Sequence, residues 1–169
     1  SAYNDTTFRD GRIVPLHSID TDLSIAELFH GRTLAFKDLA LSLFPYLLTA
    51  AKKQEKEDRD ILILTATSGD TGKAALEGFK DVPGTNIMVF YPSEGVSPMQ
   101  KQQMQKQEGK NVRVSAIHGN FDDAQSFLKR VFTSEEVNTY AHDHGVLFSS
   151  ANSINIGRLF PQIAYYVST

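Results

Sequence analysis

Short apolar runs alternate with helical segments through most of this chain, and that alternation limits the possible folds more than any other feature. Four runs have the pattern of strands buried on both faces: residues 61–64, 87–91, 112–117 and 146–148. Strand–helix alternation at this spacing is typical of a parallel sheet with right-handed crossovers. We therefore predict an α/β fold, a three-layer sandwich around a parallel sheet of about four strands.

Helical patterns fill the intervals between these runs and follow the last one. They cover residues 71–79, 97–107, 121–132, 134–144 and 155–167. A further helix is predicted to start at a Thr33 cap, because apolar residues recur there at helical spacing, and Pro45 should kink it or split it. The first thirty residues have no strong period, apart from a short extended piece at 13–16 and a turn at 20–22.

Composition excludes several classes of protein. The 169 residues suffice for one domain with a sizeable core, and 41% of them are hydrophobic, which excludes a disordered or fibrous chain. A net charge of −3 without a long block of one sign gives no reason to expect a nucleic acid or an anionic membrane as partner. No apolar run reaches the roughly 18–20 residues that span a bilayer.

The absence of cysteine bears on chemistry and location. It excludes disulfides, thiol chemistry and cysteine-based metal sites, and it makes a reducing, cytoplasmic setting the default expectation. His142 and His144 flank Asp143 at a predicted helix end, where a solvated terminus is a better interpretation than a metal site, so no metal is expected. The chain does not begin with Met and ends within an apolar helical pattern, and we expect a piece of a longer protein.

The sharpest local feature is the loop 65–73, Thr-Ala-Thr-Ser-Gly-Asp-Thr-Gly-Lys, which follows a predicted strand and opens a helix. Backbone N–H groups at a helix start, together with serine and threonine hydroxyls, can bind an anion. A tight turn with an ordinary helix cap explains the same residues about as well. A P-loop does not fit, because it needs glycine at Thr67 and a hydroxyl residue at Ala74, and the glycine spacing of a Rossmann fingerprint is missing.

Lys37 is the second candidate. It lies near the start of a mostly apolar helix, flanked by Phe36 and Leu39. An amine in such surroundings suits Schiff-base chemistry. For one lysine considered alone, an ordinary surface position is the more common explanation.

The segment 149–158, Ser-Ser-Ala-Asn-Ser-Ile-Asn-Ile-Gly-Arg, is the third candidate, since it also follows a predicted strand and enters a helix. Its hydroxyls, its two amides and the guanidinium of Arg158 suit a phosphate or a carboxylate. A capping loop with a solvent-facing arginine is the alternative. Both this segment and the loop 65–73 follow the carboxyl ends of strands, where parallel sheets bind their ligands.

Taken together, the three segments resemble the threonine synthase family, fold-type II enzymes that use pyridoxal phosphate. Residues 29–38, Phe-His-Gly-Arg-Thr-Leu-Ala-Phe-Lys-Asp, resemble its Schiff-base lysine segment. Residues 67–72 resemble the loop that holds the substrate carboxylate and faces the cofactor ring, and residues 152–158 resemble the substrate-phosphate segment. The order and spacing also match through nearly the whole chain. Arg32 departs from the usual proline and Ile156 from a common aromatic residue, which concerns loop packing more than chemistry.

The resemblance implies an activity and a role for each matched residue. The family converts O-phosphohomoserine and water to L-threonine and phosphate, by γ-elimination and then β-addition of water. Lys37 would be the catalytic residue, binding pyridoxal 5'-phosphate as a Schiff base and moving protons at the substrate Cα and Cβ. Asp70 would lie beside the cofactor ring. The substrate would be bound by Thr67, Ser68, Gly69 and Thr71 and by Asn152, Ser153 and Arg158.

The resemblance also implies a domain organisation. The family binds the cofactor phosphate with a Gly-Asn-Phe-Gly-type loop of a later domain, whereas residues 119–122 of this chain, Gly-Asn-Phe-Asp, lack the second glycine and occur too early. Residues 1–38 would be an N-terminal segment with the lysine that normally packs on the other domain, and residues 39–169 the smaller α/β domain. Without the cofactor-phosphate domain, this chain alone would be inactive and free of cofactor. That domain and the small-molecule substrate would be its partners.

Two other functions stay open. Another fold-type II enzyme, such as a dehydratase or a sulfhydrylase, would share the lysine and the first loop, but the phosphate-suited Asn152, Ser153 and Arg158 argue against it. A catalytically empty domain that only binds an anion or a partner would keep the loops without using Lys37.

Overall fold

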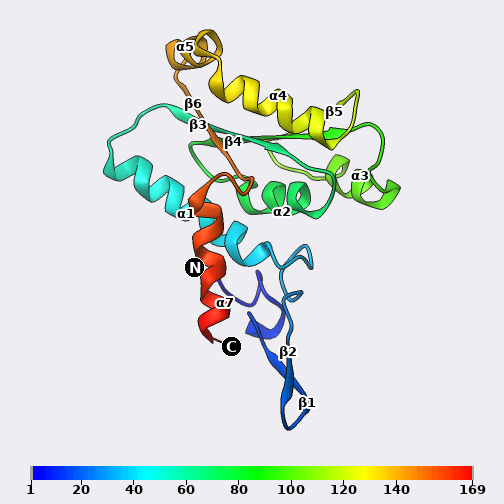
Figure 1. Ribbon diagram of the computed structural model, residues 1–169. Coiled ribbons are helices and arrows are strands. Elements are labelled where there is room, and N and C mark those ends of the chain that lie inside the picture. The colour runs from blue at the N-terminus through cyan, green and yellow to red at the C-terminus, as the bar shows by residue number, and fades with distance from the viewer. Residues whose placement is uncertain (1, 169) are drawn as a thin grey trace.

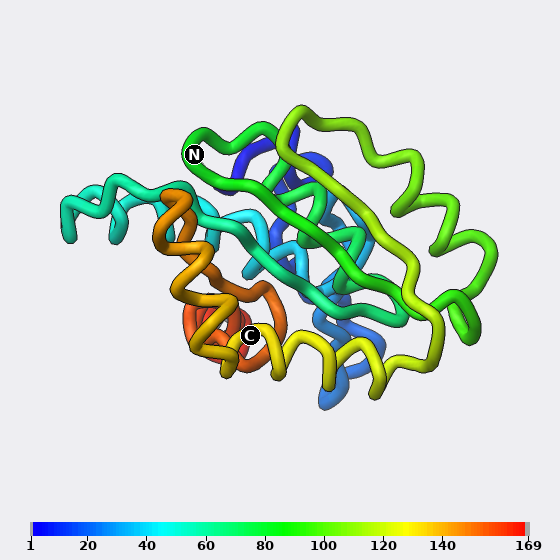
Figure 2. Tube along the Cα trace, turned by 90° about the horizontal axis from the view of Figure 1, so that it is seen from above, coloured from blue at the N-terminus to red at the C-terminus, as the bar shows by residue number. Residues whose placement is uncertain are grey.

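The computed structural model describes residues 2–168 and contains a four-stranded parallel sheet in the order β5-β4-β3-β6 (Figure 1). The strands are β3 (Asp60–Ala66), β4 (Thr85–Pro92), β5 (Val112–Ile117) and β6 (Val146–Ser150). Each contains one of the four predicted apolar runs, so the predicted α/β fold with a parallel sheet is confirmed. Figure 2, which views the molecule from above, shows the strands lying side by side.

Helices pack on both faces of this sheet and complete the three layers (Figure 1). On one side lie α1 (Asp38–Gln54), α2 (Asp70–Phe79) and α3 (Pro98–Gln105). On the other side α4 (Phe121–Thr133) packs over β3 and β4, and α5 (Glu135–Asp143) contacts β6. Because neither face of the two inner strands meets water, their residues are apolar in continuous runs rather than in alternation.

The strand residues divide between two hydrophobic cores. Side chains alternate across a strand, so neighbours in sequence point to opposite faces of the sheet. Ile63 and Val89 are buried in the core beneath α2, whereas Leu64 and Phe90 belong to the core beneath α4, where Leu128 meets them. The three layers are therefore held together by one continuous sheet with apolar surfaces on both sides.

Helix α1 begins later than its sequence pattern predicts. The pattern starts at Thr33, but the helix begins at Asp38. Thr33 donates to the Asp38 carboxylate from its backbone nitrogen (2.7 Å) and from its hydroxyl (2.6 Å). The predicted cap is thus a donor to a helix residue, and residues 33–37 form turns instead of helix.

Pro45 lies inside α1 without splitting it. Because proline has no N–H, the carbonyl of Leu41, four residues earlier, lacks its usual helical donor. Gly78 of α2 packs directly on this oxygen: a Cβ added at Gly78 would lie 2.3 Å from it. Only glycine allows the two helices to approach this closely.

We expect Gly78→Ala to lower the free energy of unfolding by about 1–3 kcal/mol, the usual cost of overpacking. We expect this loss of stability even though alanine is more favourable than glycine in a helix by about 1 kcal/mol. Urea unfolding followed by circular dichroism measures the change. Gln103→Ala on an exposed position of α3 is the control and should alter stability by less than about 0.5 kcal/mol. A Gly78→Ala protein as stable as the wild type would contradict this account of the α1–α2 contact.

The N-terminal segment forms an antiparallel hairpin outside the main sheet. Its strands are β1 (Leu16–Asp20) and β2 (Leu23–Ala26), with the predicted turn between them. The hairpin projects away from the sheet at the lower end of Figure 1. Nearer the body, Phe8 packs against Leu39 of α1 and Tyr165 near the C-terminus. The boundary predicted after residue 38 stays a prediction.

The predicted helix 155–167 consists of three short pieces. They are α6 (Ile156–Leu159), a 3-10 turn (Phe160–Gln162) and α7 (Ile163–Ser168). Asn155 caps α6, because its Oδ1 accepts the N–H of Gly157 at 2.9 Å. This helix is pressed against α1, where a Cβ added at Gly157 would lie 2.8 Å from the Phe44 ring. Among residues 2–168, no helix has the length and apolar character needed to cross a membrane.

Candidate active site

The strand order reverses between β3 and β6. From β3 the chain adds β4 and then β5 on one side, and β6 afterwards pairs with the other side of β3. In open α/β sheets, ligands bind beyond the carboxyl ends of the strands at such a reversal. The predicted loops after β3 and after β6 both leave the sheet there.

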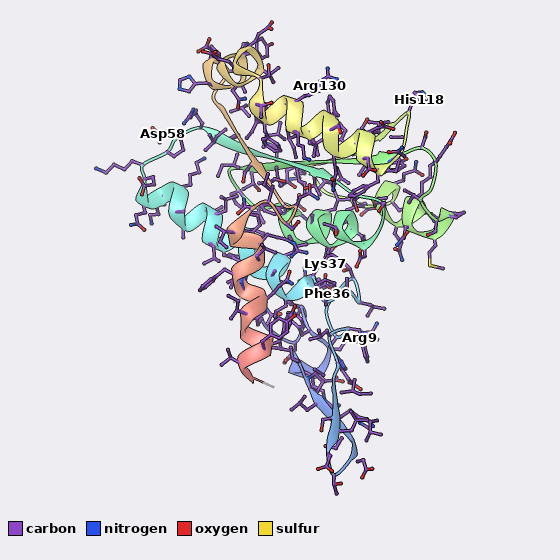
Figure 3. All side chains as sticks on the ribbon, viewed as in Figure 1. Arg9, Phe36, Lys37, Asp58, His118 and Arg130 are labelled. Carbon is purple, nitrogen blue, oxygen red and sulfur yellow. The ribbon has the colours of Figure 1, made fainter. Side chains whose placement is uncertain are left out.

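Lys37 reaches this edge from the turn before α1 (Figure 3). Its Nζ lies 2.8 Å from Oδ2 of Asp70 at the start of α2, and 4.3 Å from the centre of the Phe36 ring. The lysine side chain is 16% exposed, against 50% for the aspartate. The structure therefore brings the lysine segment to the first predicted loop, with the amine largely shielded from water.

The loop after β3 is held in shape by Thr67, which is buried. Its hydroxyl oxygen accepts the N–H groups of Gly69 (3.1 Å) and Gly72 (3.0 Å) and donates to the Gly69 carbonyl (3.0 Å). A hydroxyl has one donor and two acceptor positions, so bonds inside the loop occupy all the hydrogen-bonding positions of this side chain. Its predicted contact with the substrate stays a prediction, and its observed role is to fix the start of α2.

The other residues of this loop are open to a ligand. Ser68 and Asp70 are exposed, and Thr71 is half-buried. The first N–H groups of a helix have no partner within the helix, and those of Asp70 and Thr71 begin α2. Backbone N–H groups and two hydroxyls at a helix start form a donor set that suits a carboxylate.

Asn152 joins the loops that follow β3 and β6. Its Oδ1 accepts the N–H of Ala66 at 3.0 Å, and its Nδ2 donates to the Ala66 carbonyl at 2.8 Å. This pair of bonds extends the β3–β6 contact beyond the last paired residues, Leu64 and Ser150. Asn152 and Ser153 also line a cavity of about 300 Å³ beside α4, of which Arg158 is not a lining residue. The predicted grouping of Asn152 and Ser153 with Arg158 therefore stays a prediction.

Arg158 is buried, with 5% of its surface exposed. Its Nη1 donates to Oε1 of Gln162, and its Nε has no hydrogen-bond partner among the described residues. Burial lowers the pKa of Arg158, while the charges of Tyr165 and Asp70 act in the opposite direction. One of these two residues, Asp70, is the ion-pair partner of Lys37. The alternative of a solvent-facing arginine is wrong.

No protein-family model matches the chain. It is 39% identical to the threonine synthase of Eremothecium gossypii over 171 residues and 39% identical to that of Schizosaccharomyces pombe over 168 residues. These matches cover 95% and 96% of this chain. A crystal structure described as pyridoxal-phosphate-bound threonine synthase from Brucella melitensis matches 99% of this chain, with a TM-score of 0.84 and 40% identity. This chain is homologous to the threonine synthases.

The homology confirms the family predicted from the three motifs. The chain spans about one third of each threonine synthase that it matches: 32% of the Eremothecium and Schizosaccharomyces proteins and 34% of the Brucella chain. The shared part is the α/β unit with its N-terminal segment. Within residues 2–168, no group of three or more potential ligand side chains could hold a metal ion.

Two residues near the candidate site, Asp38 and Gln162, are not among the residues that the sequence singles out as functional. Asp38 directly follows Lys37. Its carboxylate accepts two hydrogen bonds from Thr33, which hold the turn that contains Lys37. Gln162 contacts Arg158 and lies four residues after it, a spacing that brings side chains together on a helix and could have indicated the pair. No local signal marked Asp38, because its partner Thr33 had the pattern of a helix cap.

Asp38 should make stability depend on pH in a defined direction. Burial raises the pKa of Asp38, against the lowering effect of its hydrogen bonds from Thr33. When the folded-state pKa exceeds the unfolded one, ionisation destabilises the fold, and protonation on acidification removes that cost. We expect the wild type to gain stability relative to Asp38→Asn as the pH falls through the raised folded-state pKa toward about pH 4, the ordinary range of an aspartate. Urea unfolding of both proteins tests this, and a constant difference would contradict it.

Proposed function

We propose that this chain supplies the catalytic lysine and the substrate-binding loops of a pyridoxal-phosphate-dependent lyase, a threonine synthase that converts O-phosphohomoserine and water to L-threonine and phosphate. One observation carries the proposal: Lys37 pairs with Asp70 at the loop after β3, and the buried Arg158 lies in the segment after β6, the strand that pairs with β3 at the strand-order reversal. The homology to threonine synthases supports it. A cytoplasmic location is also proposed, from the cysteine-free composition.

Pyridoxal phosphate fits one part of this site. The Lys37 amine beside the N-terminal turn of α2 suits the reacting end of the cofactor with a bound amino acid. Among residues 2–168, no loop matches the phosphate group of the cofactor. The segment that begins at Gly119 follows the edge strand β5, and the Asn120 side chain there accepts the N–H groups of Asp122 and Asp123 to cap α4. When bound, the cofactor supplies an electron-accepting ring.

In this proposal, side chains of this chain move the protons and bind the substrate. Lys37 takes the proton from the substrate Cα and moves protons at Cβ. Asp70 holds the amine at the loop. Ser68 and Thr71 bind the substrate carboxylate with their hydroxyls and the N–H groups of the helix start. Arg158 binds the phosphate on Cγ and stabilises the charge that grows as the C–O bond breaks, after which water adds at Cβ.

Turnover by the native protein tests this function. O-Phosphohomoserine should yield threonine and phosphate in equal amounts. Serine should be a far poorer substrate, because it has no phosphate for Arg158 to bind. A higher kcat/KM for serine, with keto-acid release, would favour a dehydratase instead.

The 169-residue chain alone should fold but should neither retain pyridoxal phosphate nor turn over substrate. The most strongly charged group of the cofactor has no built partner within residues 2–168, and a Schiff base alone is readily hydrolysed in water. Addition of the cofactor, dialysis and a visible absorption spectrum measure retention. A stoichiometric band of lysine-bound cofactor that survives dialysis would contradict the prediction.

A further inference from the structure

Arg158 is a buried cation whose described side-chain hydrogen-bond partner is neutral. The guanidinium donates from Nη1 to the amide oxygen of Gln162. Within residues 2–168, no carboxylate lies at ion-pair distance from it. A buried charge without a counter-charge is costly, so the site favours an anion beside Arg158.

The amide of Gln162 is held from its other end. Its Nε2 donates to the hydroxyl of Tyr165 at 3.1 Å, and Tyr165 is buried against Phe8 and Leu39. Arginine has only donors, so the amide must present its oxygen to Arg158 and its nitrogen to the tyrosine. This arrangement fixes the direction of the amide and anchors the guanidinium at Nη1.

The backbone beneath this pair is fixed as well. Asn155 caps α6, and Gly157 packs against Phe44 of α1, which leaves the turn before Arg158 little room to move. Gln162 follows Arg158 by four residues along the same helical run, so the two side chains meet without a long loop between them. Positioning of the guanidinium is therefore a property of this short run and its packing on α1.

We propose that Gln162 is a positioning residue that orients the Arg158 guanidinium without neutralising it, so that its charge remains available to the phosphate group of the substrate. This inference rests on the proposed function, in which Arg158 binds that phosphate. A carboxylate at position 162 could accept the same hydrogen bond but would cancel the charge. The neutral amide is thus the feature that leaves the cation free for an anionic ligand.

Gln162→Glu in the native protein separates orientation from charge. We expect KM for O-phosphohomoserine and the inhibition constant of inorganic phosphate to rise at least about tenfold, because the new carboxylate competes with the ligand for Arg158. The melting temperature should stay the same or rise, since an ion pair replaces a neutral bond. Gln162→Met, which keeps the size but loses the hydrogen bond, should weaken phosphate binding less, by about two- to fivefold.

Two controls separate this role from a general structural one. Binding of homoserine, which lacks the phosphate, should change less than about twofold in both Gln162 variants. Gln103→Glu on exposed α3 makes the same change in net charge and should leave phosphate binding unaltered.

The outcomes distinguish this inference from the proposed function. If Arg158→Ala selectively loses phosphate binding while Gln162→Glu binds phosphate as the wild type does, the role of Gln162 is overturned and that of Arg158 stands. If Arg158→Ala affects phosphate and homoserine equally, both assignments fail. A Gln162→Glu protein that loses phosphate and homoserine binding together, with a lower melting temperature, also overturns the positioning role.

Discussion

Lys37→Ala in the native protein should lower kcat for O-phosphohomoserine by at least about a thousandfold, because general acid–base catalysis contributes about 10²- to 10⁴-fold and the proposed role of this residue is to move protons at two carbons. The fold should survive the change. The side chain contributes one ion pair, with an aspartate that is half exposed, and it is not part of a hydrophobic core. Circular dichroism and urea unfolding verify the fold beside the kinetic measurement.

Lys80→Ala is the matched control for this lysine. Lys80 is exposed at the end of α2, and its replacement should leave kcat unchanged. Sodium borohydride supplies a second readout that does not depend on turnover, because reduction of the protein with its cofactor should attach a pyridoxyl group to Lys37 and to no other lysine. Activity within tenfold of the wild type, or labelling of a different lysine, would show that the catalytic lysine is misassigned. Complete absence of labelling would favour a catalytically empty domain.

Arg158→Ala should lower kcat/KM for O-phosphohomoserine by about a hundredfold to ten-thousandfold. A guanidinium can donate two parallel hydrogen bonds to a phosphate, each charge-assisted bond contributes about 1.5–3 kcal/mol, and about 1.4 kcal/mol corresponds to a factor of ten. Arg158→Lys keeps the charge but loses the planar fork, so its loss should lie between those of the wild type and the alanine variant. Both kcat and KM should be affected, because phosphate is at once the bound group and the leaving group in the proposed reaction.

Arg130→Ala controls for the loss of an arginine, since Arg130 is exposed on α4, away from the loops after β3 and β6 (Figure 3). It should change kcat/KM less than about twofold. Homoserine is the matched ligand, and its binding should respond far less to Arg158→Ala than that of O-phosphohomoserine. If both ligands weaken equally, or neither does, Arg158 has a structural role and the phosphate is bound elsewhere.

Much of the fold follows from local sequence patterns. An apolar run such as residues 61–64 favours a strand that is buried on both faces, and this preference does not depend on the rest of the molecule. The helix boundaries are set by equally local chemistry, as with Ser97, whose hydroxyl accepts the N–H of Gln100 at the start of α3. The anion-binding character of the loop after β3 has the same origin, because small and hydroxyl residues at a helix start leave backbone donors free.

Local patterns do not show which of several possible partners a polar side chain takes in the folded chain. Thr33 has the pattern of a helix cap, but Asp38 takes both of its donors, and α1 begins one turn later. Thr67 and Asn152 have side chains suited to a substrate, yet the first is used within its own loop and the second on Ala66, 86 residues away in sequence. The polar groups of a side chain are limited in number, and only the folded chain decides which partner takes them.

The sequence by itself determined the α/β class, the four strands, the position of most helices and the three segments that carry the proposed chemistry. The tertiary structure decided which of these segments meet. The order β5-β4-β3-β6 puts the loop after β6 beside the loop after β3, the turn before α1 brings Lys37 to Asp70, and the packing of α6 on α1 buries Arg158 against Gln162. Strand order and helix packing depend on contacts between residues far apart in the chain, which no local periodicity encodes, because their free energy arises only when the whole core is assembled.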